Sequence, residues 1–216
     1  DYYLFFELLI FSKLFHIYQK KNSAFLFSIL FLDLVLILWT KQEGFFYNII
    51  LTIIFLIFSN KSYKTRFLFT LLIFLSLLLQ IYLKNIFIGS FEFNEKILHE
   101  GLLRYLQFSN IFDTFFIISK HIIISMFRYP IWILIIIVLI FSQILHMNIK
   151  FLKFSIAYLL LFFIFVYAIY FQTTLDLNFL LPITIDRILL QGSGFMIHPF
   201  LIFFEELVKK KKINLF

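Results

Sequence analysis

The chain has 216 residues, of which 62% are hydrophobic and 22% aromatic, with a mean hydropathy of +1.00 and a net charge of +7. These values lie far from those of soluble domains and exclude an ordinary water-soluble fold. The absence of cysteine excludes disulfides, thiolate nucleophiles and Cys-based zinc or iron–sulfur sites. We therefore predict an all-α polytopic membrane protein.

Seven apolar runs are long enough to cross a bilayer, which takes about 20 residues, or somewhat fewer when flanking polar side chains reach the interface. The predicted spans are residues 2–18, 24–39, 45–59, 67–83, 131–145, 154–171 and 188–208. They divide the chain into the first four spans (1–83), an outer amphipathic segment (84–130) and the last three spans with a basic tail (131–216).

The basic residues predict the orientation of these spans. They collect in alternate loops, at Lys20 and Lys21, at residues 61–66, at residues 150–153 and in the tail 209–212. By the positive-inside rule these loops and the C-terminus are cytoplasmic, and the N-terminus lies outside. We interpret the net positive charge as this topology signal and expect no nucleic-acid partner.

The predicted orientation keeps residues 84–130 on the outer side. Residues 94–108 alternate charged and apolar side chains, and Asp113, Lys120 and His121 interrupt the apolar run 111–127. Both patterns are typical of amphipathic helices that lie in the interface. These helices either cover the bundle or form one wall of an outer cleft for a lipid-linked substrate.

A polar turn, TKQEG, lies between two predicted spans on the outer side. It holds Lys41 and Glu43 within two residues of each other. The pair is either an ordinary interfacial loop or part of a site that binds a charged ligand.

A second polar stretch, residues 170–191, precedes the last span. Pro182 is expected to delay the helix until Asp186, which would serve as its N-cap. Arg187 would then lie beside unpaired backbone N–H groups, an arrangement that favours a phosphate. The alternative is a structural ion pair between Asp186 and Arg187. Gln191, one turn beyond Arg187, faces the same side.

Charged residues inside the predicted spans need a partner or a cavity, because charge is costly there. We expect Asp33 to pair with Lys13 on the neighbouring helix. No His pair has ligand spacing with carboxylates, so we expect no metal site from the residues of this chain. Gly192 and Gly194 are expected to permit close helix contact.

Two stretches resemble motifs of bacterial members of the GT-C glycosyltransferase superfamily. An acidic residue opening a span, followed after the next span by WTKQEG, resembles the family's YxDLP and TKnEG motifs. TTLDLNFLLPITIDRILLQ resembles TPxDLxWHLxTSxDRLLLQ, and YPIW at 129–132 is similar to the family's RxWG. Residues 179 and 180 are Phe and Leu where the family has Trp and His, so a role of that His does not carry over. The matching positions are Asp176, Leu177, Asp186, Arg187, Leu189, Leu190 and Gln191.

The resemblance implies an enzyme of the bacterial inner (plasma) membrane. Such an enzyme transfers a sugar, with inversion, from a polyprenyl-phosphate carrier to a lipid, glycan or protein acceptor on the outer face. Its catalytic acid would lie in an outer loop upstream of Asp1. We therefore expect the chain to be the C-terminal portion of a longer enzyme and to be inactive alone. No cofactor is expected within it, and a divalent metal elsewhere in the full-length protein stays open.

The site expected from this resemblance and the topology lies at the outer boundary. Lys41 and Arg187 would contact the carrier phosphate, and Glu43, Asp186 and Gln191 would orient them or the sugar. The alternative is a non-enzymatic transporter or lipid flippase component of the cell envelope, which predicts an internal repeat that the sequence does not show. A third reading, an anchoring subunit, requires Lys41 and Arg187 to lie far apart.

Overall fold

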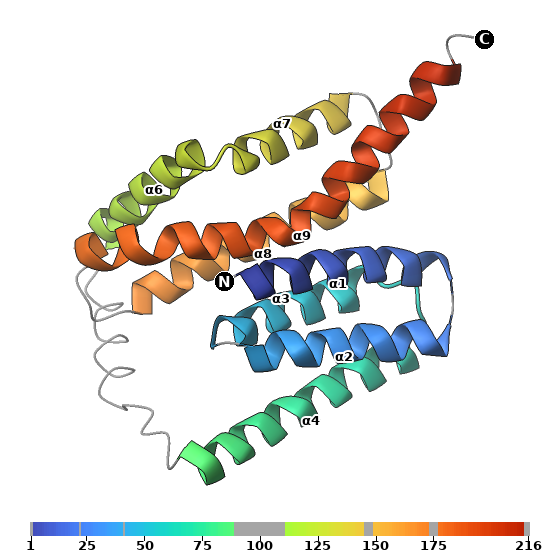
Figure 1. Ribbon diagram of the computed structural model, residues 1–216, viewed down its shortest axis with the longest axis horizontal. Coiled ribbons are helices and arrows are strands. Elements are labelled where there is room, and N and C mark those ends of the chain that lie inside the picture. The colour runs from blue at the N-terminus through green and yellow to red at the C-terminus, as the bar shows by residue number, and fades with distance from the viewer. Residues whose placement is uncertain are drawn as a thin grey trace.

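The computed structural model describes residues 2–21, 23–40, 42–88, 111–144, 149–172 and 177–213. These residues form eight helices, shown in Figure 1, and the all-helical class is confirmed. Each of the predicted spans lies within one of these helices or extends past its end by one residue. In chain order they are α1 (Tyr2–Lys20), α2 (Ala24–Thr40), α3 (Gln42–Phe58), α4 (Tyr63–Ile88), α6 (Ile111–Arg128), α7 (Ile131–Ile144), α8 (Ile149–Gln172) and α9 (Leu177–Ile213). The predicted helix at 94–108 lies outside the described residues.

Fewer helices than predicted are long and apolar enough to cross a membrane. Three stretches qualify within the described ranges: Tyr63–Leu83, Lys153–Phe171 and Leu177–Lys209. A fourth is present if α6 and α7 count as one broken span. α2 and α3 are apolar but have only 17 residues each. The described residues therefore contain three or four candidate spans, and the predicted number of seven is not confirmed.

The chain turns by 91° between α6 and α7. The turn falls at Tyr129 and Pro130, where the proline disfavours helical geometry in the residue before it. Along α6, Ile118, Ile122 and Ser125 are buried at helical spacing, so one face packs against the protein. The bend of 91° and the single buried face fit an α6 that runs across the direction of α7. The interfacial position of α6 stays a prediction.

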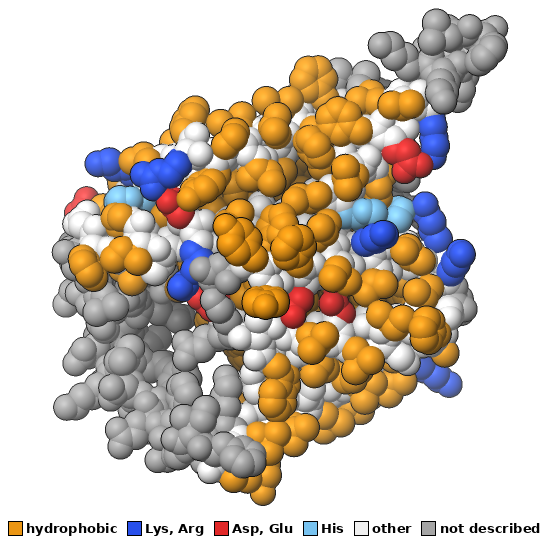
Figure 2. Space-filling model, in the orientation of Figure 1, with side chains coloured by type: hydrophobic (Ala, Val, Ile, Leu, Met, Phe, Trp, Pro, Cys, Tyr) orange, Lys and Arg blue, Asp and Glu red, His pale blue; other side chains and the backbone are white. Residues whose placement is uncertain are grey.

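Successive helices run back and forth, so their ends gather on two opposite sides (Figure 1). One side holds the start of α1, the connection from α2 to α3 and the start of α9. The other holds the connections from α1 to α2 and from α3 to α4, and the end of α9. Figure 2 shows Lys and Arg side chains on this second side, at the right of the view. The loops therefore group as the basic residues predict, while their cytoplasmic assignment stays a prediction.

α9 is the centre of the fold. It packs most extensively against α1 and also contacts α6, α7 and α8. A Cβ atom added at Gly194 would overlap the backbone of Phe5 in α1, so only glycine permits this approach. At Gly192 a Cβ would meet the ring of Phe162 in α8. The prediction that the two glycines permit close helix contact is confirmed.

Three buried aromatic side chains tie other helices to one stretch of α9. Each donates a hydrogen bond to an α9 backbone carbonyl, which provides its polar atom with a partner inside an apolar core. The pairs are Tyr47 with Ile188 at 3.1 Å, Trp132 with Leu189 at 3.1 Å and Tyr158 with Gly192 at 2.9 Å. α3, α7 and α8 thereby fix the stretch of α9 that follows Arg187.

Candidate functional site

The start of α9 differs from the prediction and changes the site. The helix begins at Leu177, so Asp186 is not an N-cap and that prediction is wrong. Pro182 lies inside the helix. Membrane helices tolerate proline because neighbouring groups satisfy the backbone carbonyl that loses its bond. The unpaired N–H groups of α9 belong to its first turn, about 14 Å along the axis from Asp186, and do not join Arg187 in an anion site.

Arg187 contacts the segment that contains the polar TKQEG turn. Its Nη2 atom donates a hydrogen bond of 2.5 Å to Oε1 of Glu43, in the first turn of α3. The side chains are partly exposed, at 38% for Arg187 and 20% for Glu43. Two predicted site residues that lie 144 positions apart in the sequence are therefore in direct contact.

Asp186 pairs with a different helix. Nη1 of Arg128, the last residue of α6, donates a hydrogen bond of 2.7 Å to Oδ2 of Asp186. Successive residues of a helix point about 100° apart, so Asp186 faces α6 and Arg187 faces α3. In place of the alternative Asp186–Arg187 pair, the structure shows two ion pairs between helices. We call Glu43, Arg187, Asp186 and Arg128 the charge row.

The remaining predicted site residues are placed unequally. Gln191 lies one turn beyond Arg187 on the same side of α9, and its side chain is fully buried. It therefore sits beneath Arg187 in the core instead of at an open surface. Lys41 lies outside the described residues, so its expected contact with the carrier phosphate, and its separation from Arg187, stay predictions.

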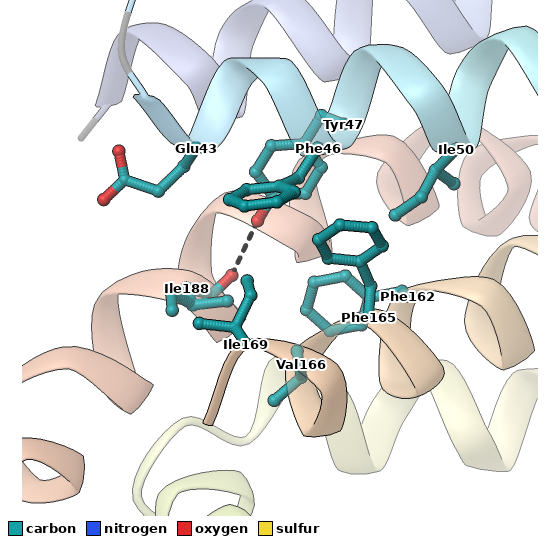
Figure 3. A pocket seen from close by; sticks show the side chains of 9 residues that line it. All are labelled: Glu43, Phe46, Tyr47, Ile50, Phe162, Phe165, Val166, Ile169 and Ile188. Atoms are coloured by element: carbon teal, nitrogen blue, oxygen red, sulfur yellow. Dashed lines mark hydrogen bonds between the residues drawn. The ribbon is translucent and has the colours of Figure 1, made fainter. Parts of the chain in front are cut away.

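An apolar hollow lies next to Glu43, between α3, α8 and α9. It is small, with a free volume of about 20 Å³, and part of it is open to the outside. Figure 3 shows the rings of Phe46, Phe162 and Phe165 turned towards its interior, while the Glu43 carboxylate stands at one end and points away. The complete lining is Glu43, Phe46, Tyr47, Ile50, Phe162, Phe165, Val166, Ile169 and Ile188. The hollow therefore offers a small apolar surface beside Glu43.

The chemistry available at the charge row is positioning and charge stabilisation. Each carboxylate accepts a hydrogen bond from an arginine, so the acids fix the direction of the guanidinium groups. Within the described ranges, no group of three or more His, Asp or Glu side chains could hold one metal ion.

Sequence reasoning missed Arg128 as a member of the site. Its signal was present: Arg128 is a basic residue on the side predicted to be outside, where the positive-inside rule disfavours arginine. A cation in a disfavoured place is a reason to search for its partner. The Phe-lined hollow had no comparable signal, because 35 phenylalanines are spread along the chain.

Comparison with known protein families, curated proteins and solved structures finds no match to this chain. The likeness to GT-C glycosyltransferases therefore rests on the sequence motifs alone.

Proposed function

We propose that the chain is part of a membrane glycosyltransferase that takes a sugar from a polyprenyl-phosphate carrier and transfers it to a lipid, glycan or protein acceptor. Arg187 binds the carrier phosphate, and Glu43 holds the guanidinium in place. The observation that supports this proposal is the Arg187–Glu43 hydrogen bond. It joins two distant segments that independently resemble motifs of one glycosyltransferase superfamily.

The geometry around Arg187 suits a phosphate. A guanidinium carries five N–H donors in a rigid plane, and one donor of Arg187 bonds Glu43. With 38% of its side chain exposed, Arg187 presents part of its surface at the protein boundary. Positive charge at this place stabilises the phosphate that leaves when the sugar is transferred. The hollow beside Glu43 offers apolar surface to the hydrocarbon of the carrier.

The test measures sugar transfer by the complete polypeptide that contains this chain, reconstituted in vesicles with a labelled polyprenyl-phosphate sugar. We expect Arg187→Ala to reduce transfer by roughly 100- to 1,000-fold, the usual loss when one charge-stabilising donor is removed. Arg187→Lys should retain an intermediate rate, because lysine keeps the charge without the planar fork. Glu205→Gln, which changes an exposed acid on the same helix, is the matched control.

Normal transfer by Arg187→Ala would remove Arg187 from the site and contradict the proposal. A wild-type protein that moves the labelled lipid across the vesicle membrane without transferring its sugar would support the transporter alternative instead.

A further inference from the structure

Two acidic side chains lie where α1 packs against α2, away from the charge row. Glu7 belongs to α1, and Asp33 and Thr40 belong to α2. Asp33 is 6% exposed, and its Oδ2 atom has no hydrogen-bond partner among the described residues. The Thr40 hydroxyl lies 2.9 and 3.1 Å from the two carboxyl oxygens of Glu7. Figure 2 shows acidic side chains over this seam between α1 and α2. We call Glu7, Asp33 and Thr40 the acid seam.

No cation compensates the acid seam within the part of the chain that the structure describes. Lys13, the expected partner of Asp33, is exposed and forms no ion pair with it, so that prediction is wrong. Instead, the acid that acts electrostatically on Asp33 is Glu7. The other described ionisable groups on helices packed against α2 are Tyr2, Tyr3, His16, Tyr18 and Lys20 on α1, Glu43 and Tyr47 on α3, and Tyr63, Lys64, Arg66 and Tyr82 on α4. On α9, which packs against α1, they are Asp186, Arg187, His198, Glu205, Glu206 and Lys209.

Those groups are engaged elsewhere or stand at helix ends. Glu43 is bonded to Arg187, and Arg66 donates to the carbonyls of Lys61 and Leu56. Two carboxylates in an apolar helix pair without a cation are costly, because each loses its hydration and repels the other. Neutralisation by a proton removes both costs.

The Thr40 hydroxyl has more acceptors within reach than its single hydrogen can serve. Its hydroxyl oxygen lies 2.7 Å from the carbonyl of Leu36, as well as near Glu7. A hydroxyl has one hydrogen to donate, and an ionised carboxylate and a carbonyl can only accept. If the hydrogen goes to Leu36, the nearer acceptor, the contact with Glu7 is a hydrogen bond only when Glu7 is protonated and donates to Thr40.

We propose that Glu7 and Asp33 form a proton-binding site, in which the two carboxyl groups together hold at least one proton at neutral pH. This proposal is independent of the glycosyltransferase proposal, because it involves neither Arg187 nor the hollow. It assigns to the seam the simplest ligand that a buried and a half-buried acid without a cation among the described residues can take.

Infrared spectroscopy of the complete polypeptide in vesicles tests the site directly. Protonated carboxyl groups show a carbonyl stretch that ionised carboxylates lack. We expect this band in the wild type at neutral pH and its disappearance as the pH is raised. The double variant Glu7→Gln/Asp33→Asn should lose the band, whereas Glu205→Gln should retain it. The wild-type titration is informative even if the double variant fails to fold.

Three results would overturn the proposal. The first is a wild type without the band at neutral pH. The second is a band that persists in the folded double variant, which would place the proton on other residues. The third is a band that arises only in Lys13→Met, which would show that Lys13 is the counter-charge of an ionised Asp33.

Discussion

The charge row and the acid seam hold their carboxyl groups in opposite ways. In the charge row each acid accepts a hydrogen bond from an arginine of another helix, and all four side chains are partly exposed. In the acid seam Glu7 contacts a hydroxyl, and among the described residues no arginine or lysine forms an ion pair with the buried Asp33. Near the protein boundary, solvent lowers the cost of charge and ion pairs are stable. Between apolar helices that cost rises, and a proton is the simpler means of removing it.

The largest expected effect is that of Gly44→Ala. Residue 44 lies in the first turn of α3, where the chain passes from the acid seam to the charge row. A Cβ atom there would overlap the backbone carbonyl of Ile37, which cannot rotate away. We expect α2 and α3 to be forced apart, a loss of about 1–3 kcal/mol in the free energy of unfolding and loss of sugar transfer. Unfolding in detergent, followed by circular dichroism, measures the loss.

Gly192→Ala is the matched control for this prediction. At that position the added Cβ meets the ring of Phe162, a side chain, instead of the backbone of another helix. Gly192→Ala should lower the free energy of unfolding less than Gly44→Ala does. An equal or larger loss would contradict the close packing of Gly44 against Ile37.

Exchange of the charges in the charge row comes next. Glu43→Arg or Arg187→Glu alone leaves like charges facing each other, and we expect each to cost about 1–3 kcal/mol of stability. The double exchange should recover most of that stability, because the pair is restored with reversed direction. It should not recover sugar transfer, since the cation has moved from α9 to α3. Double-mutant cycles on unfolding, with transfer assayed in parallel, separate the two effects.

A smaller effect on stability is expected when one acid is replaced in each region, Asp186 in the charge row and Asp33 in the acid seam. Asp186→Asn should cost up to about 1 kcal/mol, because it weakens a pair whose arginine is 59% exposed. Asp33→Asn should cost less at neutral pH, because asparagine resembles a protonated aspartate and no cation loses its partner. A larger loss for Asp33→Asn than for Asp186→Asn would mean that Asp33 is charged and paired.

The smallest effect belongs to the exposed pair near the end of α9. Glu205 and Lys209 are 2.6 Å apart, one helical turn from each other, with side chains 64% and 67% exposed. Glu205→Gln should leave the free energy of unfolding unchanged within the error of the measurement, since solvent screens such pairs. If Glu205→Gln lowered stability as much as Asp186→Asn does, solvent exposure would not explain why the Glu205–Lys209 and Arg128–Asp186 pairs differ.

The helices were largely predictable from the sequence, because apolar runs of span length leave few alternatives. The number of spans was not, since α2 and α3 are shorter than a usual crossing. The start of α9 was missed because Pro182 was interpreted by the rules for soluble helices. In a packed membrane helix, neighbouring groups compensate for the missing bond.

The site was predictable in its residues but not in its pairing. The sequence indicated Glu43, Asp186 and Arg187, while their partners depend on how the helices are rotated. Rotation also explains why Lys13 and Asp33 do not meet: Lys13 points outwards and Asp33 inwards. Such rotations are set by packing, for example at Gly194 against Phe5, and local sequence patterns do not specify them.

The connection between α2 and α3 has a consequence for the evolution of this protein. One residue separates the end of α2 at Thr40 from the start of α3 at Gln42. Thr40 contacts Glu7 on one side of this connection, and Glu43 contacts Arg187 on the other. An inserted residue would turn α3 by about 100° relative to α2, so the two contacts could not both persist. Related sequences should therefore vary in length between α3 and α4 and keep a fixed length here.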